Sequence, residues 1–279
     1  DLRSPLKDGV VREYVERDIE VARHFVGHVM GLIPRDPGEE TGVIVGVPAR
    51  ASNVSKDLML KIFREFADVV QVISEPFLVA YGQGTLMNCL VIDIGAGTTD
   101  VCALKGAMPG EKSQITVHKA GNFVTEQLEA LIVETYPDVQ TNSYVVCALK
   151  EAHGFVGSPE KQVIADLRAH GKPVAYDVTD AIRTACESLI PDILEGIERL
   201  IQTCSPEDQA TILQNVYLAG GGSRIKGMDR VIAAALRDYG DVQVRRVSDP
   251  AYAVCAGALK LAMELPPRYW EQLGGVTDY

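Results

Sequence analysis

Apolar residues along the chain follow two spacings, one typical of helices and one typical of buried strands. Near the start, six of them recur every three or four positions and predict an amphipathic helix: Val15, Ile19, Ala22, Val26, Val29 and Ile33. Short apolar runs at 43–47 and 69–73 predict buried strands, and a second helical spacing over 54–66 lies between them. Strands that alternate with helices are typical of an α/β fold.

The same alternation continues toward the C-terminus. Strands are predicted at 89–94, 99–104 and 114–119, with two more within 161–178, and helices at 124–134 and 143–151. A long helix is predicted over 179–201, broken or bent near Pro191, because proline removes a helical hydrogen bond. Pro76 is expected to open a short helix. The pattern therefore predicts a mostly parallel or mixed sheet covered by helices.

The stretch 90–100 carries the most specific chemistry. An apolar strand leads through Asp93 into a short turn, whose residues are Gly95, Ala96, Gly97, Thr98 and Thr99. Glycines let backbone N–H groups approach an anion, and the hydroxyls add donors. A carboxylate at the strand end can hold a hydrated metal ion or an attacking water. A tight β-hairpin that begins with an acid is the structural alternative.

A second glycine cluster, Gly220, Gly221 and Gly222, follows about 120 residues later. It comes after the apolar strand 215–218 and before a helical run over 223–236, for which Ser223 is a suitable N-cap. Glycines ahead of a helix N-terminus leave a surface free of side chains, on which a nucleotide base or phosphate can lie. A lone glycine triplet is equally well a linker, but the two strand-to-glycine elements together favour a shared nucleotide cleft.

These two loops resemble those of the actin, Hsp70 and sugar-kinase superfamily, with 93–100 similar to its second phosphate loop and 218–223 similar to its adenosine loop. Within it, the chain resembles the MamK branch of bacterial actin-like proteins, whose filaments align magnetosomes. The segments that carry this resemblance keep their order along essentially the whole chain: 45–52, 74–77, 93–105, 219–227 and 264–270. The resemblance implies an actin-like ATPase fold with two lobes around a nucleotide cleft.

The resemblance also implies a division of the chain. Residues 1–90 plus 250–279 would form an incomplete first lobe (IA/IB-like), and 91–249 a second lobe (IIA-like) with a IIB-like insertion at about 126–185. The family has an N-terminal phosphate-1 hairpin built as strand, Asp-x-Gly-Thr, strand. Asp8-Gly9 lacks the hydroxyl and is expected to lack the flanking strands, so this hairpin is expected to be missing. The start at Asp1 rather than Met suggests that the sequence begins within a longer reading frame.

Phosphoryl transfer from ATP to water, with ADP as product and Mg²⁺ as metal, is the chemistry that the resemblance implies. Asp93 would hold a metal-bound water, and the turn 95–99 would cradle the β and γ phosphates. Glu75 ends a strand directly before a helix, where the family keeps its water-polarising carboxylate. A carboxylate there can accept a hydrogen bond from the attacking water and stay ionised. An acid favoured by the helix dipole is the alternative for Glu75.

Further residues are assigned by the resemblance alone. Gly121 and Asn122 resemble the second backbone approach to the phosphates, although the family has a glycine pair followed by Asp. Glu187 resembles a ribose-contacting residue, with an exposed helical Glu as the alternative. The 220–222 glycines and Ser223 would face the adenosine. Trp270 is expected either in a protomer contact or docked on its own lobe.

The composition narrows the class of protein to which the chain can belong. A chain of 279 residues with 47% hydrophobic content can bury a large core. A net charge of −11 without a basic run argues against nucleic acid as a partner. The six cysteines are scattered, mostly in apolar runs, and are interpreted as reduced thiols. No apolar run approaches about 18 residues and no signal peptide is present, so we expect a cytoplasmic protein without direct membrane insertion.

The leading hypothesis is an ATP-hydrolysing cytoskeletal protomer that polymerises with itself head to tail. Its filaments would lie beside magnetosome membranes, tied to them by an acidic adaptor protein. The alternatives are a truncated, non-hydrolysing paralogue that acts as a scaffold or regulator, an MreB- or ParM-like filament for cell shape or DNA segregation, and a small-molecule kinase of the same superfamily.

Overall fold

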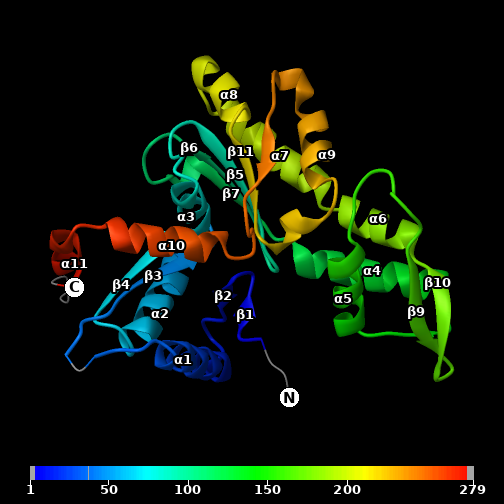
Figure 1. Cartoon of the computed structure of the whole chain (residues 1–279), viewed down its shortest axis with the longest axis horizontal. Helices are drawn as coiled ribbons and strands as arrows, with labels where there is room; N and C mark the ends of the chain where they lie inside the picture. The colour runs from blue at the N-terminus through cyan, green and yellow to red at the C-terminus, as the bar shows by residue number, and fades with distance from the viewer. Residues whose placement is uncertain (1–3, 37, 275–279) are drawn as a thin grey trace.

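The largest sheet of the computed structural model, which describes residues 4–36 and 38–274, has five strands (Figure 1). Their order is β12-β11-β5-β6-β7, and their bounds are β5 (Cys89–Ile94), β6 (Thr99–Leu104), β7 (Gln114–Val117), β11 (Val216–Ala219) and β12 (Val244–Arg246). β12, β11 and β5 run parallel, whereas β5, β6 and β7 form an antiparallel meander. The sheet is mixed, which confirms the α/β prediction.

Helices cover both faces of this sheet, as the side-chain alternation of its buried strands requires. All residues of β5 and β6 are buried. Leu90, Ile92 and Ile94 point into the larger core. Its helices include α4 (Gly121–Thr135), α6 (Thr179–Glu187), α7 (Ile190–Gln202) and α9 (Met228–Ala235). Cys89 and Val91, on the opposite face, pack against α3 (Glu75–Gly82) and α10 (Ala253–Glu264).

A smaller antiparallel sheet, β10-β9-β8, lies at the side of α4 and α6 (Figure 1, right). It contains β8 (Val139–Gln140), β9 (Ile164–Ala169) and β10 (Lys172–Asp177), and α5 (Ser143–His153) joins β8 to β9. The sequence predicts β9 and β10 but not β8, because a strand of two residues has no periodic pattern to detect.

The N-terminal part forms a separate unit, which we call the first unit. It contains β1 (Leu6–Lys7), β2 (Val10–Val11), α1 (Glu16–Gly31), β3 (Gly42–Val47), α2 (Asn53–Arg64) and β4 (Val69–Ser74). β3 and β4 are parallel. A core of its own, with Val26, Met30 and Ile62 among its members, packs α1 against α2.

The Asp8-Gly9 segment differs from the expectation that it lacks flanking strands. It is the turn of the β1–β2 hairpin, and both residues have positive φ, +53° at Asp8 and +77° at Gly9. Asp-Gly suits such a turn because both positions need left-handed backbone. The strands escaped prediction because each has two residues.

α3 and α10 lie between the five-stranded sheet and the β3–β4 pair of the first unit. α10 packs along α3 and contacts β3, whereas α3 also contacts β5 and β6. A Cβ on Gly257 would lie 1.9 Å from the carbonyl oxygen of Leu78, so the two helices meet backbone to backbone. The predicted lobe boundary at residue 90 assigns both helices to the first lobe, but they contact the sheets of both parts.

The C-terminal helix α11 (Pro267–Gly274) docks on its own chain. A Cβ on Gly42, at the start of β3, would lie 2.8 Å from the Trp270 ring. Of the two expectations for Trp270, the structure shows docking on its own unit.

Two helix predictions near the C-terminal half have different outcomes. The break expected near Pro191 is confirmed, since α6 ends at Glu187 and α7 begins at Ile190. The N-cap role of Ser223 is wrong. Ser223 lies inside the 3₁₀ turn η2 (Gly221–Arg224), and α9 begins at Met228 after the left-handed Gly227. Two further 3₁₀ turns are η1 (Glu111–Ser113) and η3 (Arg237–Tyr239).

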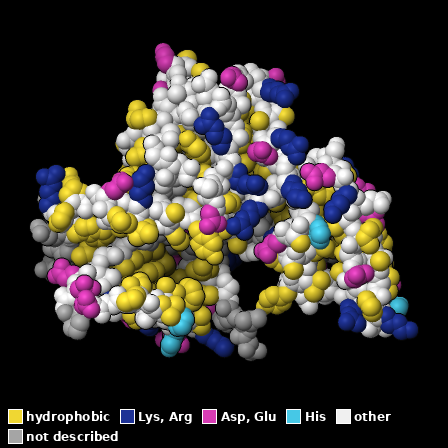
Figure 2. All heavy atoms as spheres, viewed as in Figure 1, with side chains coloured by type: hydrophobic (Ala, Val, Ile, Leu, Met, Phe, Trp, Pro, Cys, Tyr) yellow, Lys and Arg dark blue, Asp and Glu magenta, His cyan; other side chains and the backbone are white. Residues whose placement is uncertain are grey.

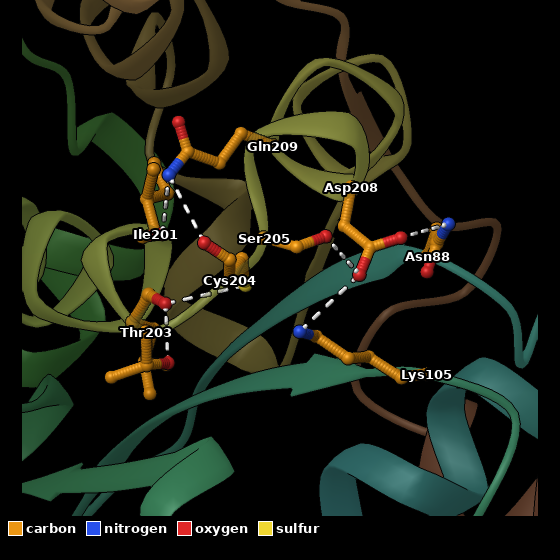
Figure 3. Close-up of polar contacts among 9 residues, drawn as sticks. Asn88, Lys105, Ile201, Thr203, Cys204, Ser205, Asp208 and Gln209 are labelled. Atoms are coloured by element: carbon orange, nitrogen blue, oxygen red, sulfur yellow. Dashed lines mark hydrogen bonds and ion pairs between the residues drawn. The ribbon is translucent and has the colours of Figure 1, made fainter.

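Helix α8 (Pro206–Leu213), which the sequence analysis missed, is fixed to the five-stranded sheet by Asp208 (Figure 3). Its carboxylate accepts hydrogen bonds from Asn88 at 3.0 Å and Ser205 at 2.9 Å, and Lys105 lies 3.4 Å away. The Ser205 hydrogen bond is the main cause of the lowered pKa of Asp208. All of these contacts lie on one side of the molecule, within the part built on the five-stranded sheet.

None of the helices within the described ranges has the length and apolar character needed to cross a membrane.

The close crossing of α3 and α10 makes Gly257 a sensitive position. We expect Gly257→Ala to lower the free energy of unfolding by about 3 kcal/mol, because the new methyl group overlaps the Leu78 carbonyl and the helices must separate. Gly31→Ala is the matched control, since nothing lies within 4 Å of its Cβ position at the end of α1. Chemical denaturation measures both, and equal stabilities would contradict the crossing geometry.

Candidate functional site

The two glycine loops meet at one edge of the five-stranded sheet. β5 and β11 are parallel neighbours, with Ala219 opposite Asp93, so the loops after them leave the sheet side by side. A Cβ on Gly220 would lie 2.3 Å from the carbonyl oxygen of Ile94 and 2.4 Å from Oδ1 of Asp93. Gly220 also has φ +75°, which favours glycine. The structure therefore brings the predicted phosphate and adenosine loops into direct contact.

Gly221 and Gly222 differ in their surroundings. A Cβ on Gly222 would lie 2.2 Å from Cγ2 of Ile94, so this glycine is needed for packing. Gly221 has nothing within 4 Å of its Cβ position and is exposed. Ser223 is buried and donates its hydroxyl to the carbonyl of Gly220 at 2.8 Å, which holds the turn closed. The open face of this loop is thus at Gly221.

The start of α4 holds the phosphate loop through two backbone hydrogen bonds. The backbone N–H of Gly121 donates to the Gly95 carbonyl at 3.0 Å, and that of Asn122 to the Ala96 carbonyl at 2.8 Å. The two backbone N–H groups that were expected to reach the phosphates therefore donate hydrogen bonds to the loop itself. The hydroxyls are also engaged, Thr98 with Asp100 at 3.4 Å and Thr99 with the Lys119 carbonyl at 2.8 Å.

Lys150 of α5 lies beside this loop and was missed by the sequence analysis. Its ammonium group donates to the carbonyl of Gly121 at 2.8 Å and to the hydroxyl of Thr125 at 2.9 Å. A fixed positive charge next to the loop suits a phosphate group. No local pattern marks Lys150, because the contact depends on the packing of α5 against α4.

Three carboxylates gather at this end of the sheet. Asp93 and Asp100 are opposite each other in the antiparallel β5–β6 pair, so their side chains share one face, and they are 6% and 1% exposed. Glu75 begins α3, at the end of β4. Burial, and then the charges of Asp93 and Asp100, raise the pKa of Glu75 to about 8.

Burial is also the main cause of the other two shifts. The pKa of Asp93 is raised to about 7, with Asp100 as the second cause. The pKa of Asp100 is raised to about 6, and hydrogen bonds from Thr116 and the Ala49 backbone limit the rise. In the protein without a cation, desolvation therefore favours the neutral form of Glu75 over the ionised form that the resemblance implies.

Asp100 was not among the predicted site residues. The hairpin register makes it detectable, since the turn between Ile94 and Thr99 places residue 100 opposite residue 93. The pairing across the turn, rather than the backbone donors within it, identifies Asp100.

The carboxylates can be compared with the needs of a metal ion. Within the described residues, no three or more His, Cys, Asp or Glu side chains are arranged so that they could hold a metal ion together. Mg²⁺ retains several waters and often uses only one or two carboxylates. Buried Asp93, with an acidic neighbour and a raised pKa, is a suitable partner for metal-bound water.

Glu187 is connected to the adenosine loop through an intervening segment of chain. It is partly buried on α6, and its carboxylate accepts a hydrogen bond from the N–H of Gly157 at 3.0 Å. The segment before Gly157 pairs with the end of the adenosine loop, since Val156 donates to the Lys226 carbonyl at 2.9 Å. Glu187 is therefore connected to this loop through the segment at 154–157.

The raised carboxyl pKa values predict how stability changes with pH. The folded protein retains protons that the unfolded chain releases, so without nucleotide and Mg²⁺ its stability falls as pH rises from about 4.5 to about 8. In Glu75→Gln one of these groups is gone. We expect the fall to be shallower by up to about 1.4 kcal/mol per pH unit.

Denaturant midpoints measured across this pH range test the expectation. Glu40→Gln, at an exposed glutamate in the loop before β3, is the matched control and should keep the wild-type slope. Equal slopes for Glu75→Gln and wild type would show that Glu75 carries no raised pKa.

Comparisons with known proteins agree with this geometry. Residues 1–266 match the family model described as MreB/Mbl protein. The chain is 50% identical to the actin-like protein MamK of Paramagnetospirillum magneticum, over 99% of this chain and 80% of the relative. A structure of a MamK double helical filament superposes with a TM-score of 0.92 at 50% identity, covering 95% of this chain and 81% of the other.

A second solved structure is a non-polymerising MamK mutant bound to AMPPNP, with a TM-score of 0.78 and 49% identity over 95% of this chain and 81% of the other. Family model, sequence identity and fold all point the same way. The chain belongs to the MreB/Mbl family of actin-like proteins, in its MamK branch.

Proposed function

We propose that this chain binds ATP and ADP with Mg²⁺ and hydrolyses ATP as the protomer of an actin-like filament. The observation that carries the proposal is the contact between Gly220 and Asp93, which joins an adenosine-type loop to a phosphate-type loop at one sheet edge. A MamK relative with 49% identity was solved with AMPPNP, which supports a nucleotide at this position. Under this proposal the two parts of the chain are the lobes of an actin-like ATPase.

Each residue then has a defined task. Asp93 holds a water of the hydrated Mg²⁺, and the backbone of 95–99 faces the phosphates with the Lys150 ammonium beside it. Bound Mg²⁺ supplies positive charge that favours the ionised forms of the neighbouring carboxylates. Ionised Glu75 accepts a hydrogen bond from a water molecule and orients it toward the γ-phosphate. Gly221 offers an open surface to the base, and Glu187 holds the 154–157 segment next to this loop.

Filament formation follows from the relatives. A structure at 50% identity is named a MamK double helical filament. We propose that this chain associates with itself head to tail, since repeated contacts that do not close produce filaments. Its place would be the cytoplasmic cytoskeleton, in filaments beside magnetosome membranes.

An acidic adaptor protein remains part of the proposal, and one surface supports it. Exposed basic residues follow the adenosine loop: Arg224, Lys226, Arg230, Arg237, Arg245 and Arg246. Three acidic residues lie within 224–246, and Arg224 also pairs with Asp249 at 3.4 Å, in a chain with a net charge of −11. Figure 2 shows Lys and Arg side chains gathered on this face, over α9 and β12. A basic surface on an acidic protein steers acidic partners.

Glu75→Gln tests the hydrolysis proposal. The amide keeps the shape of the side chain but does not attract the proton of the attacking water, so phosphate release should fall about 10²-fold or more. Pelleting with ATP should persist, because assembly needs the bound nucleotide rather than its cleavage. Coupled phosphate assays and sedimentation with ATP, ADP and no nucleotide measure the two properties. Unchanged hydrolysis would remove Glu75 from the mechanism, and the Glu40→Gln control should behave as wild type.

Two neighbouring glycines test the nucleotide position. Gly221→Ala adds a methyl group in open space and should leave the melting temperature unchanged. If the base lies on this surface, the same change weakens ATP binding by about tenfold, the effect of roughly 1.4 kcal/mol of steric overlap. Gly220→Ala should instead destabilise the fold, because its Cβ meets the Ile94 carbonyl. Titration with fluorescent ATP measures this affinity. If Gly221→Ala binds ATP with wild-type affinity, the base does not lie on this surface.

A further inference from the structure

Asp100 lies where the first unit touches the phosphate loop. Its carboxylate accepts hydrogen bonds from the hydroxyls of Thr116 and, at 3.4 Å, Thr98, both in the five-stranded part. The third donor comes from the other part: the backbone N–H of Ala49, in the turn after β3, faces the same carboxylate and stabilises its charge. Asp100 and Ala49 are 1% and 3% exposed, so this contact excludes solvent.

A second contact lies next to it. A Cβ on Gly97 would be 2.9 Å from Cα of Asp8, so the tip of the β1–β2 hairpin rests directly on the phosphate loop. A Cβ on Gly9 would be 2.6 Å from Pro48, which places the tip and the Pro48–Ala49 turn against each other. The hairpin tip and this turn together form one surface of the first unit, and it faces Gly97, Thr98 and Asp100.

The hairpin is firmly attached to the first unit. Arg12, next to β2, pairs with the fully buried Asp18 of α1. Glu13 accepts hydrogen bonds from the hydroxyls of Ser52, at 2.8 Å, and Ser55, at the start of α2. A displacement of the hairpin tip must therefore move α1 and α2 as well.

Next to these contacts the hairpin is separated from β7. A cavity of about 460 Å³ lies between the hairpin and β7, with Lys7, Arg12, Arg50 and His118 among its lining residues. His118 and Asp8 approach to 3.8 Å at its edge, but both are largely solvent-accessible and such a pair contributes little. The contacts at Gly97 and Asp100 therefore join the first unit to the phosphate loop, and the one between Asp100 and Ala49 excludes solvent.

We propose that Asp100 is a positioning residue: by holding the Ala49 turn against the phosphate loop, it sets the distance between the first unit and the five-stranded part and couples that distance to what the loop binds. The coupling to nucleotide rests on the proposed function, whereas the control of distance does not. Asp100 acts through the loop and the turn, and needs no contact with the nucleotide itself.

Distance measurements between spin labels test this. One label goes on native Cys147 of α5, and the other on Lys61→Cys of α2, with the exposed Cys255 replaced by Ser. α2 and α5 lie on opposite sides of the β1–β2 hairpin (Figure 1). Without nucleotide, Asp100→Ala should give a longer and broader distance distribution than the parent, because the Ala49 turn loses its acceptor.

The conservative variant separates positioning from general damage. In Asp100→Asn the amide oxygen still accepts from the Ala49 N–H, and the amide nitrogen donates to a threonine hydroxyl, which also accepts. Its distribution should return close to that of the parent. Asp208→Asn is the matched control: that carboxylate also has hydroxyl and amide partners, but all of them lie in the five-stranded part (Figure 3), so the distances should not change.

Gly97→Ala approaches the same contact independently. Its methyl group overlaps Asp8 and should push the first unit outward, with the same broadening. If Asp100→Ala does not fold, Gly97→Ala provides the test. A broader distance distribution in Gly97→Ala then supports the inference, and an unchanged distribution overturns it. If Asp100→Ala folds and its distances match those of Asp208→Asn, the inference is wrong.

Adding AMPPNP then tests the coupling. Asp100→Ala should bind it about tenfold more weakly than the parent, as expected for the loss of a hydrogen bond to a charged group, and Asp100→Asn should recover most of the affinity. Equal affinities for Asp100→Ala and the parent overturn the coupling. If the parent itself binds no AMPPNP, the proposed function fails, and the nucleotide-free distances still decide the role of Asp100.

Discussion

The parallel pairing of β5 with β11 is the constraint on which the rest of the site depends. It aligns Ala219 with Asp93 and makes the two following loops leave the same sheet edge. Because Gly220 has no side chain, its backbone lies directly against the Ile94 carbonyl and the Asp93 carboxylate. Any side chain at this point would separate the loops, so the proposed nucleotide site depends on a backbone contact rather than on a set of reactive groups.

The close approach of these strands and loops also brings three carboxyl groups together. Glu75, Asp93 and Asp100 reach one end of the sheet from β4, β5 and β6, and burial raises the pKa of each. Buried carboxyls without a cation favour their neutral forms, which weakens hydrogen bonds to an incoming water. A cation beside Asp93 would restore the charge of Glu75, so metal binding and the activation of water are linked by electrostatics before any substrate is considered.

The sequence was sufficient for the large elements and for the two glycine loops that the structure brings into contact. Strands β5 and β6 have the predicted ends because they are continuous apolar runs closed by a glycine turn. The elements that escaped are those whose local signal is weak: the two-residue strands of the hairpin at Asp8-Gly9, and the short helix α8, which depends on Asp208 and its partners. Ser223 shows the opposite error, since a suitable capping residue bonded to Gly220 within its own turn.

Site residues that depend on tertiary contacts were also out of reach. Lys150 arrives beside the phosphate loop through helix packing, and the neutral state of Glu75 depends on burial that no local pattern specifies. Asp100 is different, because the hairpin register alone places it opposite Asp93. One face of this hairpin thus presents two carboxylates with different surroundings. Asp93 lies against the adenosine loop, whereas Asp100 faces Ala49 of the first unit. All residues of β5 and β6 are buried. Because packed interiors deform little, a two-stranded element with a different partner at each carboxylate is suited to transmit a displacement of the phosphate loop to the first unit.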